Sequence, residues 1–150
     1  MKKIFIACSK WCYQFIPEFK QALELMDFEV ILPNYYDNPM IEEDIKANGD
    51  LISHQEFCKQ SFKLSMQKSK ESDAILVLNL DKIKDGVVYP NYIGGATFLE
   101  MYDSYLLGHD IFLFNQIPDG MLKDEIEGMC PTILNGDLKK IKTNTKTLHK

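Results

Sequence analysis

The chain contains no arginine, because all 17 of its basic residues are lysines. Only a guanidinium group offers the planar fork of donors that pairs with a carboxylate or phosphate through two hydrogen bonds. The chain therefore supplies no arginine finger and no phosphatase loop built on a cysteine and an arginine. Any phosphate that it binds must be held by lysine, by hydroxyl groups or by backbone N–H groups at a helix N-terminus.

Long apolar runs are also missing. Runs such as residues 74–78 and 111–114 are far shorter than the about 18 residues of a membrane span. Residues 1–7 lack the apolar region and the cleavage site of a signal peptide. We therefore expect a cytoplasmic protein with no membrane partner. The formal charge of −5 further argues against a nucleic acid duplex as a partner.

Cysteine is scarce, and the four cysteines are expected to be free thiols. Cys8 and Cys12 lie four residues apart, as do His54 and Cys58, so together they offer a candidate zinc ligand set. No Cys-x-x-Cys pair is present, however, and cysteine is commonly a small buried apolar residue. We therefore expect no metal and no other cofactor.

Short apolar segments alternate with amphipathic helical segments along the chain. Strands are predicted at residues 3–8, 29–32, 74–78 and 110–114, with a fifth at 132–134, and helices at 17–27, 51–71, 96–107 and 122–128. Residues 35–50 and 80–92 are predicted loops, the first with one helical turn around residues 42–46. This alternation predicts an α/β fold, namely a flavodoxin-like or Rossmann-like three-layer sandwich with a parallel sheet of four to five strands. We expect one domain over residues 1–138 and a lysine-rich C-terminal tail over residues 139–150.

The most unusual stretch, residues 91–102, reads Asn-Tyr-Ile-Gly-Gly-Ala-Thr-Phe-Leu-Glu-Met-Tyr. It follows a predicted strand headed by Asp73 and precedes another strand. This order resembles the nucleoside 2-deoxyribosyltransferase-like superfamily, in a less characterised branch. Members have a small flavodoxin-like domain, an aspartate at the start of the third strand, and a glycine-rich turn before a helix that carries a glutamate. The resemblance follows residues 3–114, and its specific part is Asp73 with residues 94–102.

The resemblance implies roles for these residues. Glu100 would be the nucleophile that attacks the anomeric carbon of a nucleoside or nucleotide and expels the base. Asp73 would lie in the same cleft, and Gly94, Gly95 and Thr97 would form the substrate-binding turn. The resemblance also implies a homo-oligomer, because the family often completes its cleft with a neighbouring subunit.

The chemistry of Glu100 can also be considered without the resemblance. A carboxylate beside the anomeric carbon stabilises or traps the oxocarbenium-like transition state of glycosidic cleavage. Glu100 lies in the first turns of its predicted helix, so we expect the helix dipole to favour its ionised form. The simpler interpretation is that Glu100 only complements this dipole. For Asp73 the simpler interpretation is a turn residue, because a position before a parallel strand lies away from the expected cleft.

Other candidate residues follow the predicted strands, where ligands bind in parallel sheets. Ser9 and Lys10 are placed to contact a phosphate or a ribose hydroxyl, and Trp11 or Tyr13 to stack on a base. For Trp11, covering the sheet edge or a subunit contact is the alternative. Asn115 is placed to read a base edge, or only to cap the following turn.

Two functions stay open at this point. The first is an enzyme that cleaves the N-glycosidic bond of a small-molecule nucleoside or nucleotide, by hydrolysis or by (deoxy)ribosyl transfer. The alternative is a non-catalytic nucleotide-binding or sensing domain in which Glu100 only binds a hydroxyl. A flavodoxin-like electron carrier is disfavoured, because no Ser/Thr-rich phosphate loop follows the first strand. The absence of arginine favours nucleosides or loosely discriminated nucleotides.

Overall fold

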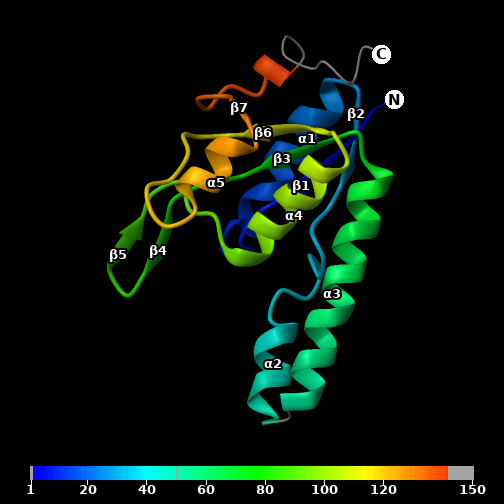
Figure 1. Cartoon of the computed structure of the whole chain (residues 1–150), viewed down its shortest axis with the longest axis vertical. Coiled ribbons are helices and arrows are strands. Elements are labelled where there is room, and N and C mark those ends of the chain that lie inside the picture. Colours follow the sequence, from blue (N-terminus) through cyan, green and yellow to red (C-terminus); the bar gives the residue numbers. More distant parts are fainter. Residues whose placement is uncertain (1, 50, 142–150) are drawn as a thin grey trace.

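The computed structural model describes residues 2–49 and 51–141. A five-stranded parallel sheet in the order β2-β1-β3-β6-β7 forms the centre of the molecule (Figure 1). Counted along the sheet strands alone, this is the flavodoxin-like order 2-1-3-4-5. The predicted fold class is confirmed, with all five expected strands present. They are β1 (Lys2–Ala7), β2 (Phe28–Ile31), β3 (Ala74–Val77), β6 (Asp110–Leu113) and β7 (Thr132–Ile133).

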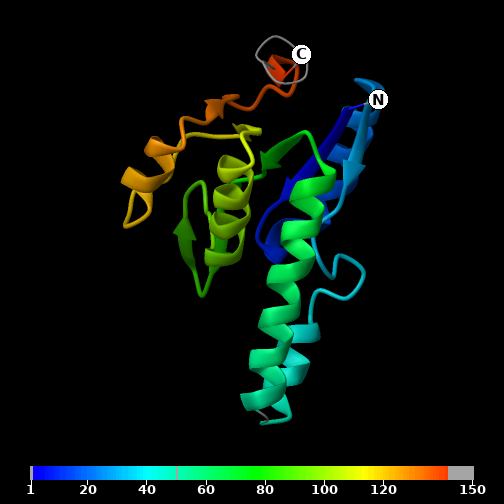
Figure 2. The same cartoon turned by 45° about the vertical axis from the view of Figure 1, so that its right-hand side comes forward.

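Helices cover both faces of the sheet. One face carries α1 (Ile16–Leu25) and the short 3₁₀ helix η1 (Lys10–Phe15) that precedes it. The other face carries α4 (Gly95–Leu106) and α5 (Lys123–Gly128), and α3 (Leu51–Glu71) lies beside α4 (Figures 1 and 2). The predicted loop over residues 35–50 contains α2 (Ile41–Ala47), which is longer than the single turn expected there.

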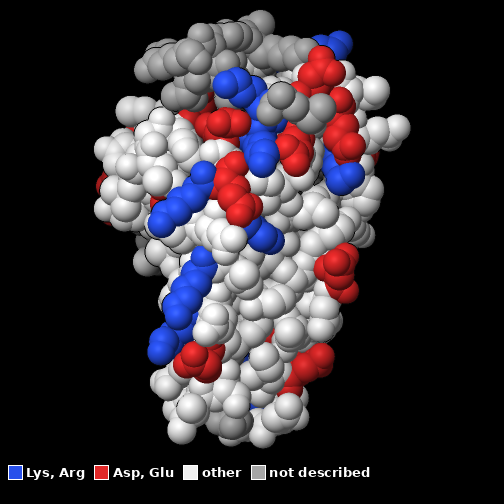
Figure 3. All heavy atoms as spheres, turned by 90° about the vertical axis from the view of Figure 1, so that its right-hand side faces the viewer, with Lys and Arg blue, Asp and Glu red and all other residues white. Residues whose placement is uncertain are grey.

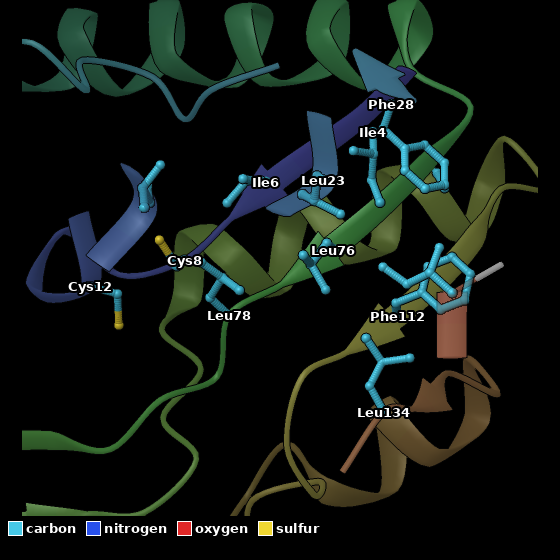
Figure 4. Packing of buried hydrophobic residues seen from close by; sticks show 13 residues of the cluster. Ile4, Ile6, Cys8, Cys12, Leu23, Phe28, Leu76, Leu78, Phe112 and Leu134 are labelled. Atoms are coloured by element: carbon cyan, nitrogen blue, oxygen red, sulfur yellow. The ribbon is translucent and has the colours of Figure 1, made fainter. Parts of the chain in front are cut away.

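Two apolar cores lie on the two faces of the sheet. On the α1 side, Ile4, Ile6 and Leu76 pack with Leu23 (Figure 4). On the α4 side, the alternate residues of the same strands pack with Met101 and Ile126. Because β1 and β3 are buried on both faces, their sequences are apolar runs without alternation.

The folded domain extends further than the sequence analysis predicted. Ile141, assigned there to the tail, is completely buried in the core on the α1 side, where Leu138 also packs. The expected boundary at residue 138 is therefore wrong by at least three residues. The rest of the expected tail, residues 142–150, lies outside the described residues.

The predicted loop over residues 80–92 contains an antiparallel hairpin. Strands β4 (Lys82–Lys84) and β5 (Val87–Tyr89) pair through a turn at Asp85 and Gly86, which have φ of 52° and 77°. Positive φ at both central residues is typical of the type I′ hairpin turn, for which Asp-Gly is a preferred sequence. The prediction of an irregular loop is therefore wrong for this segment.

The N-terminal half of α3 and the whole of α2 extend beyond the sheet (Figures 1 and 2). We call α2 and residues 51–61 the helical arm. No residue of α2 is buried, and Ser69, near the other end of α3, is the buried residue of that helix. The arm therefore has no apolar core of its own. Among the described residues, no helix combines the length and the apolar character needed to cross a membrane.

Candidate active site

A cleft of about 1220 Å³ opens at the carboxyl end of the sheet, where ligands bind in doubly wound folds. Its walls come from the segment after β1, the segment after β2, one side of α3 and the beginning of α4. The residues predicted from the sequence that line this cleft are Ser9, Lys10, Trp11, Tyr13, Gly94, Gly95, Thr97 and Glu100.

Glu100 points inward because of its place on α4. The helix begins after Gly94, and its buried residues are Thr97, Glu100, Met101 and Ser104. This spacing of three to four residues puts them on one face of the helix. Glu100 is only 7% exposed, and its Oε2 accepts a hydrogen bond of 2.8 Å from Ser65 Oγ.

A chain of hydrogen bonds extends from Glu100 to the segment after β2. Ser65 Oγ accepts a bond of 2.8 Å from Asn34 Nδ2, which also donates to the carbonyl of Ser61 at 3.2 Å. The hydroxyl of Tyr13 donates to the carbonyl of Asn34 at 3.2 Å. The bonds thus join η1, α3 and α4 around the carboxylate. Within the described part of the chain, the buried Oδ1 of Asn34 accepts no hydrogen bond.

Burial controls the protonation of Glu100. Loss of solvent raises the pKa of Glu100 to about 7, against the opposing effects of the Ser65 hydrogen bond and the Lys68 charge. The nearby charge of Asp103 acts in the same direction as burial. At neutral pH the carboxyl group is therefore close to half protonated.

This result corrects the expectation that the helix dipole keeps Glu100 ionised. Glu100 lies six residues after the N-cap Gly94, whereas the favourable effect of the dipole falls off within the first turn. Desolvation of a nearly buried carboxylate is the larger effect at this position. The simpler interpretation, that Glu100 only complements the helix dipole, is disfavoured because Glu100 lies beyond the first turn and is buried.

Aromatic side chains and lysines line the rest of the cleft. Trp11 is 49% exposed, and Lys82 Nζ on the hairpin lies 5.5 Å from its ring centroid and 4.4 Å from that of Tyr92. Tyr35 stacks on Phe57 with centroids 4.9 Å apart. Lys10, Lys63, Lys70 and Lys82 all line the cleft, and Lys10 forms an ion pair with Glu43. The cleft thus combines flat apolar surfaces with lysine point charges.

Asp73 is not part of this site. Its Oδ2 accepts a hydrogen bond of 2.8 Å from the backbone N–H of Lys3, and its own N–H donates to the carbonyl of Lys3 at 2.8 Å. These bonds connect the amino end of β3 to the amino end of β1. The cleft lies at the opposite, carboxyl end of these strands. The prediction that Asp73 shares the cleft with Glu100 is therefore wrong, because the strand direction separates the two carboxyl groups.

Asn115 also lies outside the cleft. Its N–H donates to Asn79 Oδ1 at 2.8 Å, and Asn79 Nδ2 donates to the carbonyls of Asn115 and Gln116 at 3.0 and 2.9 Å. Asn115 lines a separate, smaller pocket with Phe15 and Phe19 of the α1 side. The prediction that Asn115 reads a base in the cleft is wrong, because Asn115 does not line the cleft. Its bonds with Asn79 connect the ends of β3 and β6, which differs from the turn cap considered as the alternative.

Residues of the site that the sequence did not predict include Asn34, Ser65 and Asp103 around Glu100, and Lys82 and Tyr92 on the cleft wall. Ser61, Ser65 and Ser69 repeat every four residues, and this polar stripe on a helix was a usable signal. Asp103 lies three residues after Glu100 on α4, lines the cleft, and has a pKa raised by burial. Asn34 follows the strand predicted at residues 29–32, at the end of the sheet where ligands bind, but its pairing with Ser65, 31 residues away, had no signal in the sequence.

No model of a known protein family matches the chain, and no curated protein matches it at a significant level. The assignment of a function therefore depends on the geometry and electrostatics of the cleft, together with the resemblance at residues 94–102.

Proposed function

We propose that the protein cleaves the N-glycosidic bond of nucleosides or nucleotides, with Glu100 as the nucleophile. The observation that carries this proposal is a single buried carboxyl group with a pKa of about 7 inside a large cleft. Such a group costs folding stability when ionised, so its position needs a reason other than stability. The glycine turn before Glu100 supports the same reaction through the family resemblance.

The proposed reaction has two steps. In the first, the ionised carboxylate of Glu100 forms a bond to the anomeric carbon, the C–N bond breaks, and the base leaves with the bonding electron pair and takes up a proton. In the second step, water or a second nucleobase attacks the same carbon, and the ester bond between Glu100 and the anomeric carbon breaks. The carboxylate is regenerated, and the attacking group loses a proton to solvent. Ser65 holds Oε2, which leaves Oε1 for the anomeric carbon.

Asp103 is the candidate proton donor for the leaving base. It lies one helical turn after Glu100, lines the cleft, and has a pKa raised by burial. A raised pKa increases the fraction of a carboxyl group that carries a proton near neutral pH.

The cleft walls suit a nucleoside or a nucleotide. Trp11 and Tyr92 offer aromatic faces of the kind on which bases stack. Lys10 and Lys82 offer point charges to a 5′-phosphate, with less geometric selectivity than arginine. The proposed substrates are therefore nucleosides and loosely discriminated nucleotides.

A homo-oligomer is part of the proposal. Leu51, Ile52, Phe62 and Leu64 on α3 are exposed, and Figure 3 shows a broad uncharged area in the centre of one face of the molecule. Phe62 also lines the cleft, so a neighbouring copy on this helix would lie next to the site. Light scattering after size-exclusion chromatography tests this, and a strictly monomeric protein at assay concentration would contradict it.

A non-catalytic nucleotide-binding domain is the second candidate. The raised pKa of Glu100 favours it, because a neutral carboxylic acid can donate a hydrogen bond to a sugar hydroxyl. In that case the protein binds nucleosides or nucleotides without releasing the base.

Incubation with each common nucleoside and deoxynucleotide, followed by chromatography of the free base, separates the two candidates. We expect base release by the wild type and none by Glu100→Ala. Release that is unaffected by the substitution would contradict the role of Glu100. Binding by calorimetry without release from any substrate would favour the binding domain.

A further inference from the structure

Three potential metal ligands meet on the helical arm, at the end of the cleft that is built by α2 and α3. They are Glu42 of α2 and His54 and Cys58 of α3. One ligand atom from each residue lies within 4.8 Å of the other two. The residue spacing made His54 and Cys58 candidate zinc ligands together with Cys8 and Cys12, but in the structure Glu42 lies next to His54 and Cys58 instead.

The distances within this cluster fit a tetrahedral metal ion. His54 Nε2 lies 3.3 Å from Glu42 Oε2 and 3.8 Å from Cys58 Sγ. In a tetrahedral zinc site with ordinary bond lengths, a nitrogen and an oxygen ligand lie about 3.3 Å apart, and a nitrogen and a sulfur ligand about 3.6 Å apart. The two distances from His54 thus agree with such a site, and the ligand atoms of Glu42 and Cys58 lie within 4.8 Å of each other.

The local structure explains why these side chains converge. His54 and Cys58 lie four residues apart on one face of α3, as ligand pairs on helices commonly do. Glu42, in the first turn of α2, faces them from the neighbouring helix. The other oxygen of Glu42, Oε1, is 3.7 Å from Lys46 Nζ, which leaves Oε2 directed to His54.

The weak packing of the arm is an independent reason to expect a cross-link there. Helix α2 has seven residues, none of them buried. Isolated helices shorter than about 12–15 residues are marginal in water. Domains that lack an adequate apolar core commonly use a metal to hold their elements together. An ion bound by Glu42, His54 and Cys58 would hold α2 against α3 in this way.

We propose that Glu42, His54 and Cys58 form a binding site for a zinc-class divalent ion, with water as the fourth ligand. Thiolate and imidazole ligands select zinc or cobalt over magnesium and calcium. On binding, His54 uses the lone pair of Nε2, and the S–H bond of Cys58 breaks with release of the proton to solvent as the S–metal bond forms. Glu42 and Cys58 also line the cleft, so the ion would form part of its wall.

Cobalt titration of the chelator-treated full chain tests the site, because a cobalt–thiolate bond produces a charge-transfer absorption band. We expect one cobalt ion per chain, displaced by zinc and unaffected by magnesium or calcium. Cys58→Ser and His54→Gln should weaken binding by more than about 100-fold, beyond the about 10–100-fold effect of substitutions outside the ligand shell. Glu42→Gln, which removes the third proposed ligand charge, should weaken it by more than about 100-fold as well. The exposed Cys130 provides the matched control Cys130→Ser, which should bind as the wild type does.

Thermal unfolding gives a second readout. Zinc should raise the Tm of the wild type and of Cys130→Ser, and should not raise that of Cys58→Ser. Circular dichroism checks that each variant folds. If Cys58→Ser does not fold, His54→Gln becomes the decisive variant. Absence of the charge-transfer band in the wild type, or its persistence in Cys58→Ser, would overturn the proposal. The inference does not depend on the proposed function, because base release is not among its readouts.

Discussion

The two acidic residues that the sequence linked to catalysis lie at opposite ends of the parallel strands. Their environments differ accordingly. At the carboxyl end of the strands, Glu100 is buried in a large cleft. It accepts a hydrogen bond from a side-chain hydroxyl, and burial raises its pKa to about 7. At the amino end of the strands, Asp73 accepts a hydrogen bond from the backbone N–H of Lys3 and connects the start of β3 to the start of β1. Glu100 thus lines a cleft and is bonded to a side chain, whereas Asp73 lies at the opposite end of the strands and is bonded to the backbone.

The largest expected difference between substitutions of Glu100 and of Asp73 is in the rate of base release. Glu100→Gln keeps the shape of the side chain but removes the nucleophile, so release should fall by at least about 1000-fold. Asp73→Asn, the matched substitution at the amino end of the sheet, should change the rate by less than about twofold, because Asp73 is not among the described residues that line the cleft. Steady-state rates of free-base formation measure both. An equal loss of rate in both variants would contradict the assignment of different roles to Glu100 and Asp73.

The raised pKa of Glu100 should also make the stability of the protein depend on pH. Its pKa is about 7 in the folded protein and 4.5 as the ordinary value, so the native state binds more protons than the unfolded chain between these values. The stabilising contribution of the neutral acid is present below pH 4.5 and is lost as the pH rises through 7. The loss corresponds to about 3 kcal/mol of the free energy of unfolding.

Urea unfolding of the wild type and of Glu100→Gln at pH 5, 6, 7 and 8 measures this loss. The difference between the two proteins isolates Glu100 from other titrating groups, among them Asp103. Wild-type stability should decrease relative to the variant across this range. A difference that is constant with pH would show that Glu100 keeps an ordinary pKa.

Asp73 should affect stability without affecting the rate of base release. Asp73→Ala removes the acceptor for the Lys3 N–H, so the free energy of unfolding should fall by about 2 kcal/mol. Base release per folded molecule should stay unchanged. Chemical denaturation and an assay corrected for the folded fraction check the two parts, and a loss of specific activity would return Asp73 to the site.

The smallest expected effect concerns the partner of Glu100. The Ser65 hydroxyl lowers the pKa of Glu100, so Ser65→Ala should move the pH–rate profile to higher pH. The rate at pH 6 should fall about tenfold and the rate at pH 8 by less, in line with a hydrogen bond worth about 1.5 kcal/mol. Ser69→Ala, one turn along the same helix and outside the cleft, is the control and should leave the profile in place.

The elements of the fold were predictable where a periodic pattern extends over many residues. The helix predicted at residues 51–71 agrees with α3, and the apolar strands β1 and β3 were located within one residue at each end. The hairpin was missed because Asp, Lys, Gly and Pro in residues 80–92 suggested an irregular loop, although Asp85-Gly86 lies between β-forming residues. Ile141 was missed because it is one apolar residue among lysines.

The candidate site was predictable in part, and the reason is topological. Residues after β1 and the turn before Glu100 lie at the cleft because parallel strands end at the same edge. The raised pKa of Glu100 was not predictable, because it arises from burial by segments distant in sequence. Asn115 was misplaced because a strand end at the correct edge still has two sides, and its side chain lies with Asn79 away from the cleft.

Detection of a sugar bound to Glu100 tests the central claim most directly. The protein is mixed with the best substrate of the base-release assay, quenched in acid within the first turnover, digested, and analysed by mass spectrometry of its peptides. We predict that the peptide carrying Glu100 gains the mass of the sugar in the wild type and not in Glu100→Gln. A sugar on any other peptide, or undiminished base release by Glu100→Gln, would contradict the assignment of Glu100 as the nucleophile.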